Sequence, residues 1–194
     1  LVLEKIPGHI PDESYRSIIR NPLIRIKDIP TIDDYPTAYD MLVEYLKERI
    51  YFVDEREYYV TASFIVLAWG HDMLHILPYL HFIGQPGSGK TRACEVVSSL
   101  CYRSLNTVSI STAAIPRIIE KYHPTLIMDE FSSFNQQDTS ESIKIVNSGY
   151  RKDTKYVRIN METLEPETFD TFCPKLMAGL ENLVQTLESR TVRI

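Results

Sequence analysis

An eight-residue segment near the middle of the chain combines three glycines with a lysine and a hydroxyl residue at a fixed spacing. It reads Gly84-Gln85-Pro86-Gly87-Ser88-Gly89-Lys90-Thr91, which matches the pattern G-x-x-x-x-G-K-[ST] at every position. Glycines let the main chain turn tightly, so that successive N–H groups point toward one anion. The Lys90 ammonium adds a positive charge, and the Thr91 hydroxyl is of the type that coordinates Mg²⁺. The segment predicts a loop that binds the phosphates of ATP with Mg²⁺, and Arg92 is included among the expected contacts.

The surroundings of this loop fit its proposed chemistry. Residues 80–83 are a short apolar run that predicts a buried strand entering the loop. Helical spacing begins at Lys90 and continues to Leu100, so the positive end of a helix is expected to face the anion. A chance match in a glycine-containing loop is the alternative, and the position between a strand and a helix argues against it.

A second apolar run ends in two carboxylates. Residues 125–128 predict a strand, and Asp129 and Glu130 follow it directly. Open parallel sheets place ligands at the carboxyl ends of their strands, where these acids would lie. We expect Asp129 to hold the magnesium through water and Glu130 to orient and deprotonate the attacking water. Alone, the pair could be an ordinary strand end; together with the upstream loop it predicts the second half of a nucleotide site.

Strands and helices alternate through the rest of the chain, which is typical of parallel strands joined by crossover helices. The residue pattern predicts helices over 37–50, from Asp54 to Trp69, from a cap at Ser111 or Thr112 to about Tyr122, and over 140–147, with strands over 107–110, 175–178 and 191–194. The prolines of residues 1–36 predict short turns on a surface. The predicted fold class is α/β, a mostly parallel five-stranded sheet flanked by helices. A small helical subdomain over 1–76 is expected to precede a core over 77–194.

Composition limits the function and the compartment. The formal charge of -5 over 194 residues argues against a general nucleic-acid coat, although a local basic strip remains possible. The three cysteines form no C-x-x-C pair, which indicates a reducing compartment. Because no run approaches the roughly 20 apolar residues of a membrane span and no signal peptide is recognisable, we expect a cytoplasmic protein without a membrane partner. The first residue is Leu1 instead of Met, which suggests a fragment.

With both motifs placed, residues 78–194 resemble the AAA+ P-loop ATPases. They are most similar to the helicase-type ATPase domains associated with primases of plasmids, phages and other mobile elements. The stretches that carry this resemblance, besides the glycine loop, are 111–119, 126–130, 145–151, 174–179 and 186–190. The resemblance implies a ring-forming homo-oligomer, expected to be a hexamer, in which ATP hydrolysis powers unwinding or translocation of DNA.

The resemblance also implies roles for residues near the end of the chain. Arg190 matches the position from which such ATPases offer an arginine to the γ-phosphate bound by the next subunit, with Arg193 as a weaker substitute. The alternative for Arg190 is a solvated residue at a strand edge. A polar residue beyond the fourth strand positions water in the family; Gly179 stands at the expected tip, and Asn182 is the candidate. The sequence stops after the fifth predicted strand, so the helical lid is expected to be absent or truncated.

A basic stretch before the fourth strand suggests a contact with nucleic acid. Residues 156–159 alternate as in a strand, and a return strand over 168–172 after a turn at Pro166 would complete a hairpin. Its cations are Arg151, Lys152, Lys155 and Arg158. Cations neutralise phosphates and neighbouring tyrosines stack on bases, but a solvated hairpin is an equal alternative.

Three other features of the sequence have no role in the predicted nucleotide site. His71 and His75 stand four residues apart, as in zinc proteases, but ordinary helix histidines explain them better because no third ligand is apparent. Arg117 is expected on a helix facing a neighbouring subunit or water. Phe131 and Phe134 are expected to anchor packing. The functions left open are a DNA motor, an ATPase that remodels proteins, and a non-catalytic nucleotide-dependent assembly switch.

Overall fold

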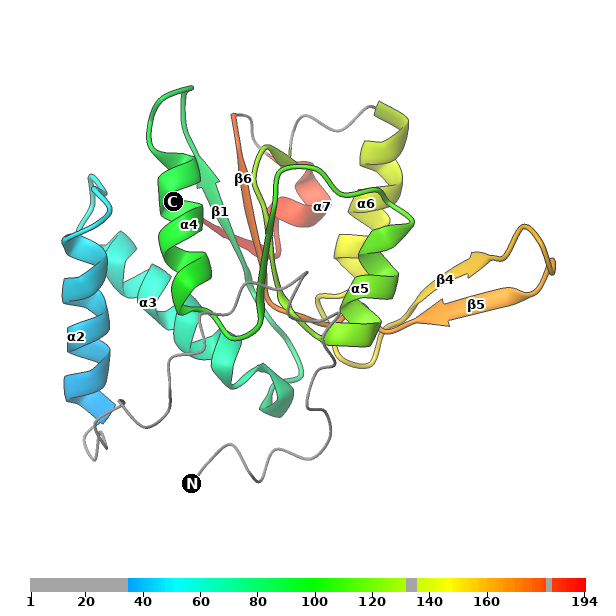
Figure 1. Cartoon of the computed structure of the whole chain (residues 1–194), viewed down its shortest axis with the longest axis horizontal. Coiled ribbons are helices and arrows are strands. Elements are labelled where there is room, and N and C mark those ends of the chain that lie inside the picture. Colours follow the sequence, from blue (N-terminus) through cyan, green and yellow to red (C-terminus); the bar gives the residue numbers. More distant parts are fainter. Residues whose placement is uncertain (1–34, 132–135, 181–182) are drawn as a thin grey trace.

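The computed structural model describes residues 35–131, 136–180 and 183–194, with a parallel sheet at its centre (Figure 1). Its five strands run in the order β2-β3-β6-β1-β7, and every pairing is parallel. The strands of the sheet are β1 (Tyr79–Ile83), β2 (Ser104–Thr107), β3 (Thr125–Met128), β6 (Lys175–Gly179) and β7 (Thr191–Arg193). This arrangement confirms the predicted α/β class and the five-stranded parallel sheet.

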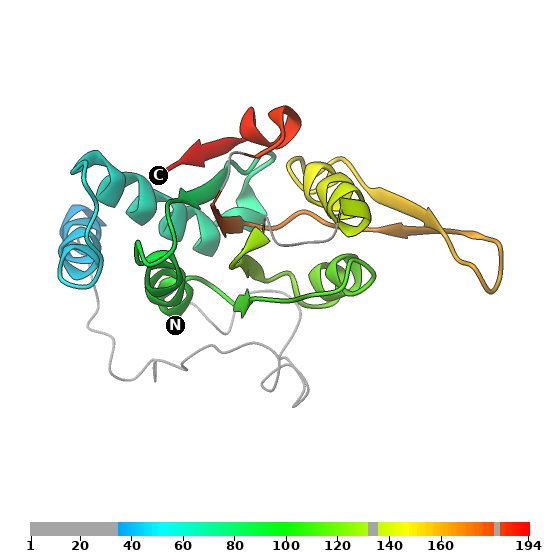
Figure 2. The ribbon, with the colours of Figure 1, turned by 90° about the horizontal axis from the view of Figure 1, so that it is seen from above.

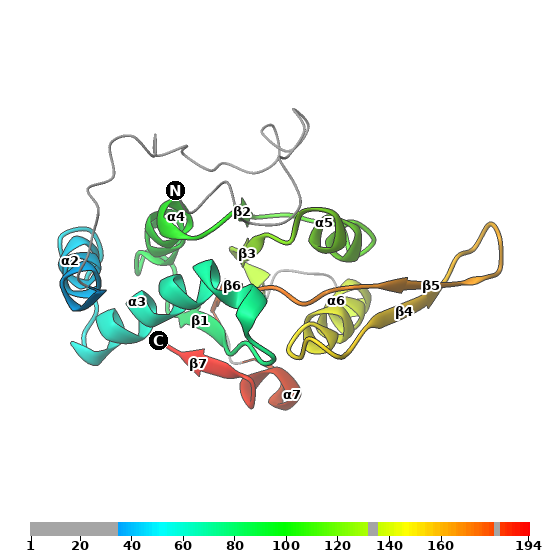
Figure 3. The same cartoon turned by 90° about the horizontal axis from the view of Figure 1, so that it is seen from below.

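Helices cover both faces of the sheet. They are α2 (Tyr35–Lys47), α3 (Arg56–Trp69), the 3-10 helix η3 (His71–Met73), α4 (Lys90–Leu100), α5 (Ala114–Tyr122), α6 (Gln136–Ser148) and α7 (Gln185–Glu188). Figures 2 and 3 show α2, α3 and α4 on one side and α5 and α6 on the other. Crossover connections between parallel strands place helices on both faces of a sheet. On the first side α2 packs on α3 and lies farther from the sheet than α4.

Alternating side chains of the strands supply two apolar cores. On one face Leu80, Phe82 and Leu176 pack with buried residues of α2, α3 and α4. On the other face Tyr79 and Met177 pack with buried residues of α5, α6 and α7. Successive strand residues point to opposite faces, so a strand buried on both sides reads as a continuous apolar run. This is why the short runs before the glycine loop and before the acidic pair indicate central strands.

The helical segment that precedes β1 packs on the same core as the sheet. Leu46 of α2 and Phe64 of α3 belong to the cluster that contains Phe82 of β1 and Val97 of α4. The helix predicted from Asp54 begins at Arg56, its N-cap is Glu55, and no side chain caps it. The Asp54 carboxylate accepts the Arg56 N–H just before this helix (2.9 Å). No helix in the described part of the chain is long and apolar enough to cross a membrane.

An antiparallel hairpin, β4 (Tyr156–Ile159) and β5 (Pro166–Phe169), connects α6 to β6 and projects from the body (Figure 1). The sequence predicted this hairpin, but the return strand over 168–172 was wrong. β5 begins at Pro166, which a free strand edge tolerates because proline has no N–H to donate. It ends at Phe169, since the Asp170 carboxylate accepts the Phe172 N–H and turns the chain toward β6 (3.0 Å).

Other predicted boundaries also differ from the structure. The strand predicted over 107–110 is β2 at Ser104–Thr107, because pairing with β3 sets its register, Ser104 opposite Thr125. The predicted caps of α5 were wrong: the helix begins at Ala114, its N-cap is Ala113, and no side chain caps it. The helix predicted over 140–147 begins earlier, at Gln136.

The paired histidines do not share a helix face. His71 lies in η3, whereas His75 lies beyond it in a bend before an isolated bridge at Ile76. Buried His71 approaches the Ala68 carbonyl oxygen through Nδ1 (3.0 Å). The described residues contain no cluster of three or more His, Cys, Asp or Glu side chains arranged to hold a metal.

Candidate functional site

The glycine loop connects the carboxyl end of β1 to the first residue of α4. The Gly84 N–H donates to the Gly179 carbonyl oxygen at the end of β6 (3.3 Å), which ties the loop to the neighbouring strand. Residues 85–89 are exposed, so the surface of the loop is open to solvent. The Ala93 N–H donates to the Gly89 carbonyl oxygen (2.9 Å), so α4 starts immediately behind the loop.

Three glycines are needed at this loop for two different reasons. Gly87 and Gly89 have φ angles of 79° and 93°, the left-handed region that other residues enter only with strain. An added Cβ at either position would meet no atom within 4 Å, so the space above them is open. At Gly84 an added Cβ would lie 2.6 Å from Ser88 Oγ, so the limit there is close packing inside the loop.

The Lys90 ammonium lies over the main chain of the loop. Its Nζ donates to the carbonyl oxygens of Gly84 (2.6 Å) and Gln85 (2.9 Å), and lies 3.5 Å from Ser88 Oγ. Lys90 is half-buried, while Thr91 and Arg92 on the first turn of α4 are exposed. The cation is therefore held at the mouth of the loop by uncharged oxygens, and Arg92 lies 3.8 Å from Glu95 on its own helix.

The acidic pair follows β3 at the same edge of the sheet. Strand pairing sets Met128 level with Met177 of β6, and Met177 level with His81 of β1. Asp129 and Glu130 therefore follow β3 at the height where β1 runs into the loop. Only β6 separates these strands, which gives a main-chain distance of about 10 Å.

The two acids differ in environment. Asp129 is 5% exposed, its N–H donates to the Thr107 carbonyl oxygen (2.9 Å), and its Oδ1 accepts the Glu130 N–H (3.1 Å). Glu130 is exposed and has a φ of 59°, a left-handed conformation that is strained for a residue with a Cβ. Asp129 is thus held within the candidate site, whereas Glu130 extends into solvent. No residue pattern predicted the left-handed conformation of Glu130.

The pKa of the buried Cys94 thiol on α4 is shifted by charges from both motifs. Burial raises its pKa well above the ordinary value, the Asp129 carboxylate raises the pKa further, and the Lys90 ammonium lowers it. Cys94 therefore lies within electrostatic range of Lys90 after the loop, Asp129 after β3 and Glu95 on its own helix.

The residues present fit a nucleotide with Mg²⁺. The two left-handed glycines form an open cradle, and the helix behind it presents its positive end. Magnesium in phosphate sites is held by one or two protein oxygens together with the phosphates, so it needs no closed cage of side chains. Thr91 and Asp129 would supply such oxygens.

Arg190 lies at the end of the sheet where β1 begins, opposite the end that carries the glycine loop. It precedes β7, whose first residue pairs with Tyr79 at the start of β1, whereas the loop follows the end of that strand. Its guanidinium donates to Asn147 Oδ1 (2.6 Å) and to the Thr186 carbonyl oxygen, and lies 5.5 Å from the centre of the Tyr150 ring. The structure does not bring it to the loop of its own chain. Sequence reasoning assigned Asn147 no role, although it lies in a stretch that carries the resemblance.

The remaining residues of the predicted site have different positions. Asn182 lies outside the described residues, as does Phe134. Phe131 is buried in the core, as predicted. Arg193 is exposed on β7, one strand away from His81.

Each cation of the predicted nucleic-acid stretch has an acceptor within the chain. Arg151 pairs with Asp153 (2.9 Å), Lys155 with Asp170 (2.7 Å) and Arg158 with Glu167 (3.1 Å), while Lys152 Nζ donates to the Asp72 carbonyl oxygen (2.6 Å). Residues 151–170 contain four basic and five acidic residues, so the segment is not basic as a whole. The prediction rested on the cations, whereas the acids that pair with Lys155 and Arg158 lie across the turn of the hairpin.

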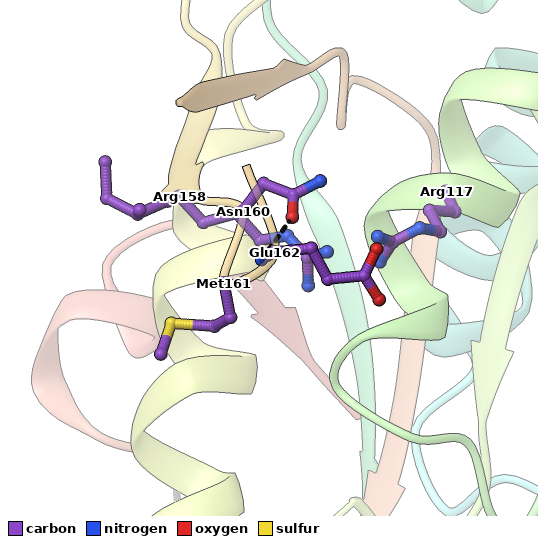
Figure 4. Close-up of a pocket in the computed structure, with 6 residues that line it drawn as sticks. Arg117, Arg158, Asn160, Met161 and Glu162 are labelled. Carbon is purple, nitrogen blue, oxygen red and sulfur yellow. Dashed lines mark hydrogen bonds between the residues drawn. The ribbon is translucent and has the colours of Figure 1, made fainter. Parts of the chain in front are cut away.

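A cavity of about 270 Å³ lies between the hairpin and α5 (Figure 4), away from the glycine loop. Arg117 and Arg158 line it. Arg117 lies 3.6 Å from Glu167 and 5.5 Å from the centre of the Phe169 ring, so it faces β5 and not simply water. Residues 159–162 of the hairpin complete the wall of the cavity, and the Arg117–Glu167 pair joins the hairpin to α5.

Comparison with known proteins leaves the family open. No protein-family model and no curated protein matches the chain. Among solved structures, the crystal structure of JCV helicase bound to N-(4-(2-(thiazolo[5,4-c]pyridin-2-yl)phenoxy)phenyl)acetamide is similar at a TM-score of 0.47 and 14% identity. The similarity covers 83% of this chain and 45% of that one, so the chain spans less than half of the helicase's length.

Proposed function

We propose that this chain binds ATP with Mg²⁺ and hydrolyses it as an AAA+ type P-loop ATPase. The observation that carries the proposal is the meeting of the glycine loop and the acidic pair at one edge of the sheet, on either side of β6.

Each residue has a role that follows from its environment. The loop amides and the Lys90 ammonium bind and orient the phosphates, and Thr91 and Asp129 hold the metal, which supplies neutralisation of charge on the phosphate oxygens. Buried Asp129 is held by the Glu130 N–H, which suits a ligand of fixed orientation. Exposed Glu130 is suited to orient a water and accept its proton.

Assembly into a ring is part of the proposal. Arg190 is remote from the loop of its own chain, yet Asn147 fixes its guanidinium, as is useful for a group presented to a neighbour. DNA remains the proposed substrate on the resemblance alone. The paired cations near the hairpin do not exclude a phosphate contact, because exposed ion pairs contribute only about 0–1 kcal/mol and exchange readily.

Phosphate release with and without Mg²⁺ tests the proposed activity, with Glu130→Gln as the matched variant. We expect Mg²⁺-dependent turnover in the assembled protein, and a fall of at least about 100-fold in Glu130→Gln with nucleotide affinity retained. Full turnover by the variant would remove Glu130 as the base. Stimulation by single-stranded DNA, compared with stimulation by an unfolded polypeptide, separates a DNA motor from a protein-remodelling ATPase.

A further inference from the structure

The outward side of the hairpin is apolar. Val157 and Ile159 on β4 are 57% and 53% exposed, and Met161 and Leu164 in the connecting turn are 84% and 73% exposed. Side chains alternate along a strand, so Val157 and Ile159 share one face while Tyr156 and Arg158 share the other. Soluble proteins use contiguous exposed apolar groups of this kind mainly as binding surfaces. We name these four residues, with Glu162 and Glu165 between and beside them, the hairpin arm.

The charge of the hairpin arm argues against a nucleic-acid partner. Residues 159–174 contain no Lys, Arg or His, and Glu162 and Glu165 are exposed at the tip. In Figure 4 the Met161 side chain points away from Arg117, whereas the Glu162 carboxylate points toward Arg117. Phosphate backbones are bound by cations, and an acidic tip repels them. The hairpin arm instead suits a protein surface that is apolar and bordered by basic groups.

The chain itself carries such a surface at the end of α3. Val66 and Trp69 are each 51% exposed, and Met73 in η3 is 82% exposed. The Trp69 ring lies 5.2 Å from the Tyr102 ring, and the Arg103 guanidinium lies 4.9 Å from the centre of the Tyr102 ring. We name Val66, Trp69, Met73 and Tyr102 the aromatic patch. Tryptophan, tyrosine, methionine and arginine are enriched at protein interfaces.

Lys152 gives the aromatic patch a second basic border. Its Nζ donates to the Asp72 carbonyl oxygen (2.6 Å), which holds the ammonium beside η3. The Asp72 carboxylate in the same border is 77% exposed. The border therefore has two positive charges, from Arg103 and Lys152, and one negative charge, from Asp72. The apolar and acidic hairpin arm is thus complementary to the aromatic patch.

We propose that the hairpin arm of one copy docks on the aromatic patch of a second copy of this chain. The proposal rests on the homo-oligomeric part of the proposed function and names its contact surfaces. The two surfaces differ, so the contact is head-to-tail and each copy keeps one of each surface for a further neighbour. Such a contact builds a ring when its rotation closes.

Cross-linking with introduced cysteines tests the pairing of the two surfaces. The native Cys94, Cys101 and Cys173 are all buried, so an added surface cysteine is the accessible one. A Met161→Cys chain is mixed with a differently tagged Met73→Cys chain and treated with a short bismaleimide. The control replaces Met73→Cys with Val53→Cys, a position that is 90% exposed on the connection before α3.

We expect a cross-linked pair of differently tagged chains with Met73→Cys and little with Val53→Cys. Equal cross-linking to both positions overturns the proposal, as does a chain that stays monomeric by light scattering at the highest concentration reached. Because nucleotide is not needed in this assay, cross-linking without ATP turnover would leave the interface standing and remove the ATPase. ATP turnover without cross-linking would leave the ATPase standing and remove the proposed interface.

Leu164→Glu provides a second test that does not disturb the core, because Leu164 is 73% exposed. We expect at least about a tenfold weaker self-association in sedimentation experiments, with unchanged affinity for a single-stranded oligonucleotide. Weaker oligonucleotide binding with unchanged self-association would show that the tip contacts nucleic acid and would overturn the proposal.

Discussion

Replacing Lys90 with methionine removes the ammonium from the phosphate loop and keeps an unbranched apolar side chain. The φ angles of Gly87 and Gly89 and the main-chain bond that begins α4 do not involve the ammonium, which within the described residues bonds only to the Gly84 and Gln85 carbonyl oxygens and lies near Ser88. We therefore expect Lys90→Met to weaken nucleotide binding without unfolding the loop.

The size of the effect follows from the contacts of the ammonium. A unit charge about 4 Å from a phosphate charge near a protein surface contributes about 4 kcal/mol. To reach a phosphate, Lys90 Nζ gives up one of its bonds to the carbonyl oxygens of Gly84 and Gln85, a loss of about 2 kcal/mol for a charged donor. The remaining 2 kcal/mol or so corresponds to about a 30-fold higher Kd in the variant.

Calorimetric titration with a slowly hydrolysed ATP analogue and Mg²⁺ measures this Kd. Lys144→Met is the matched control, because it makes the same change at an exposed lysine of α6. Thermal unfolding of both variants checks that the fold is retained. A Kd for Lys90→Met within about threefold of the unsubstituted chain, or an equal loss in Lys144→Met, would refute the assignment of the loop.

Three further predictions concern the rest of the chain. Arg190→Ala should lower turnover, and mixing it with Lys90→Met chains should restore part of the activity, because one chain then supplies the arginine and the other an intact loop; no recovery in mixed assemblies counts against a shared site. Gly149→Ala should lower the free energy of unfolding in urea by about 2 kcal/mol or more, because the new Cβ would lie 2.0 Å from a main-chain oxygen; unchanged stability would contradict that close contact. Burial, helped by the Arg193 charge, lowers the pKa of His81 to about 4, so the unfolded chain takes up this proton first and stability falls as the pH drops from about 6.5 toward 4, by up to about 3 kcal/mol. His81→Gln should flatten the pH dependence of unfolding in that range, and identical curves would show that His81 is not responsible.

Local sequence predicted the central strands and helices well. Residues 90–100 were predicted as a helix and form α4, and residues 125–128 were predicted as a strand and form β3. β3 is buried at every position, and α4 buries one face, so the apolar pattern of each is clear. Among the strands, the errors lie in the edge strand β2 and the return strand β5, where pairing with a neighbouring strand sets the boundaries and the local pattern does not. Among the helices, the errors lie at the starts of α5 and α6.

The sequence by itself predicted the glycine loop, because glycine conformations, a lysine and a hydroxyl residue at fixed spacing are local properties. It also determined that an acidic pair ends a buried strand. Only the tertiary structure decided that β6 lies between the two motifs, and that acids beyond a turn pair with Lys155 and Arg158. The physical reason is that charge pairing and strand order depend on contacts between residues distant in sequence, which a motif does not encode.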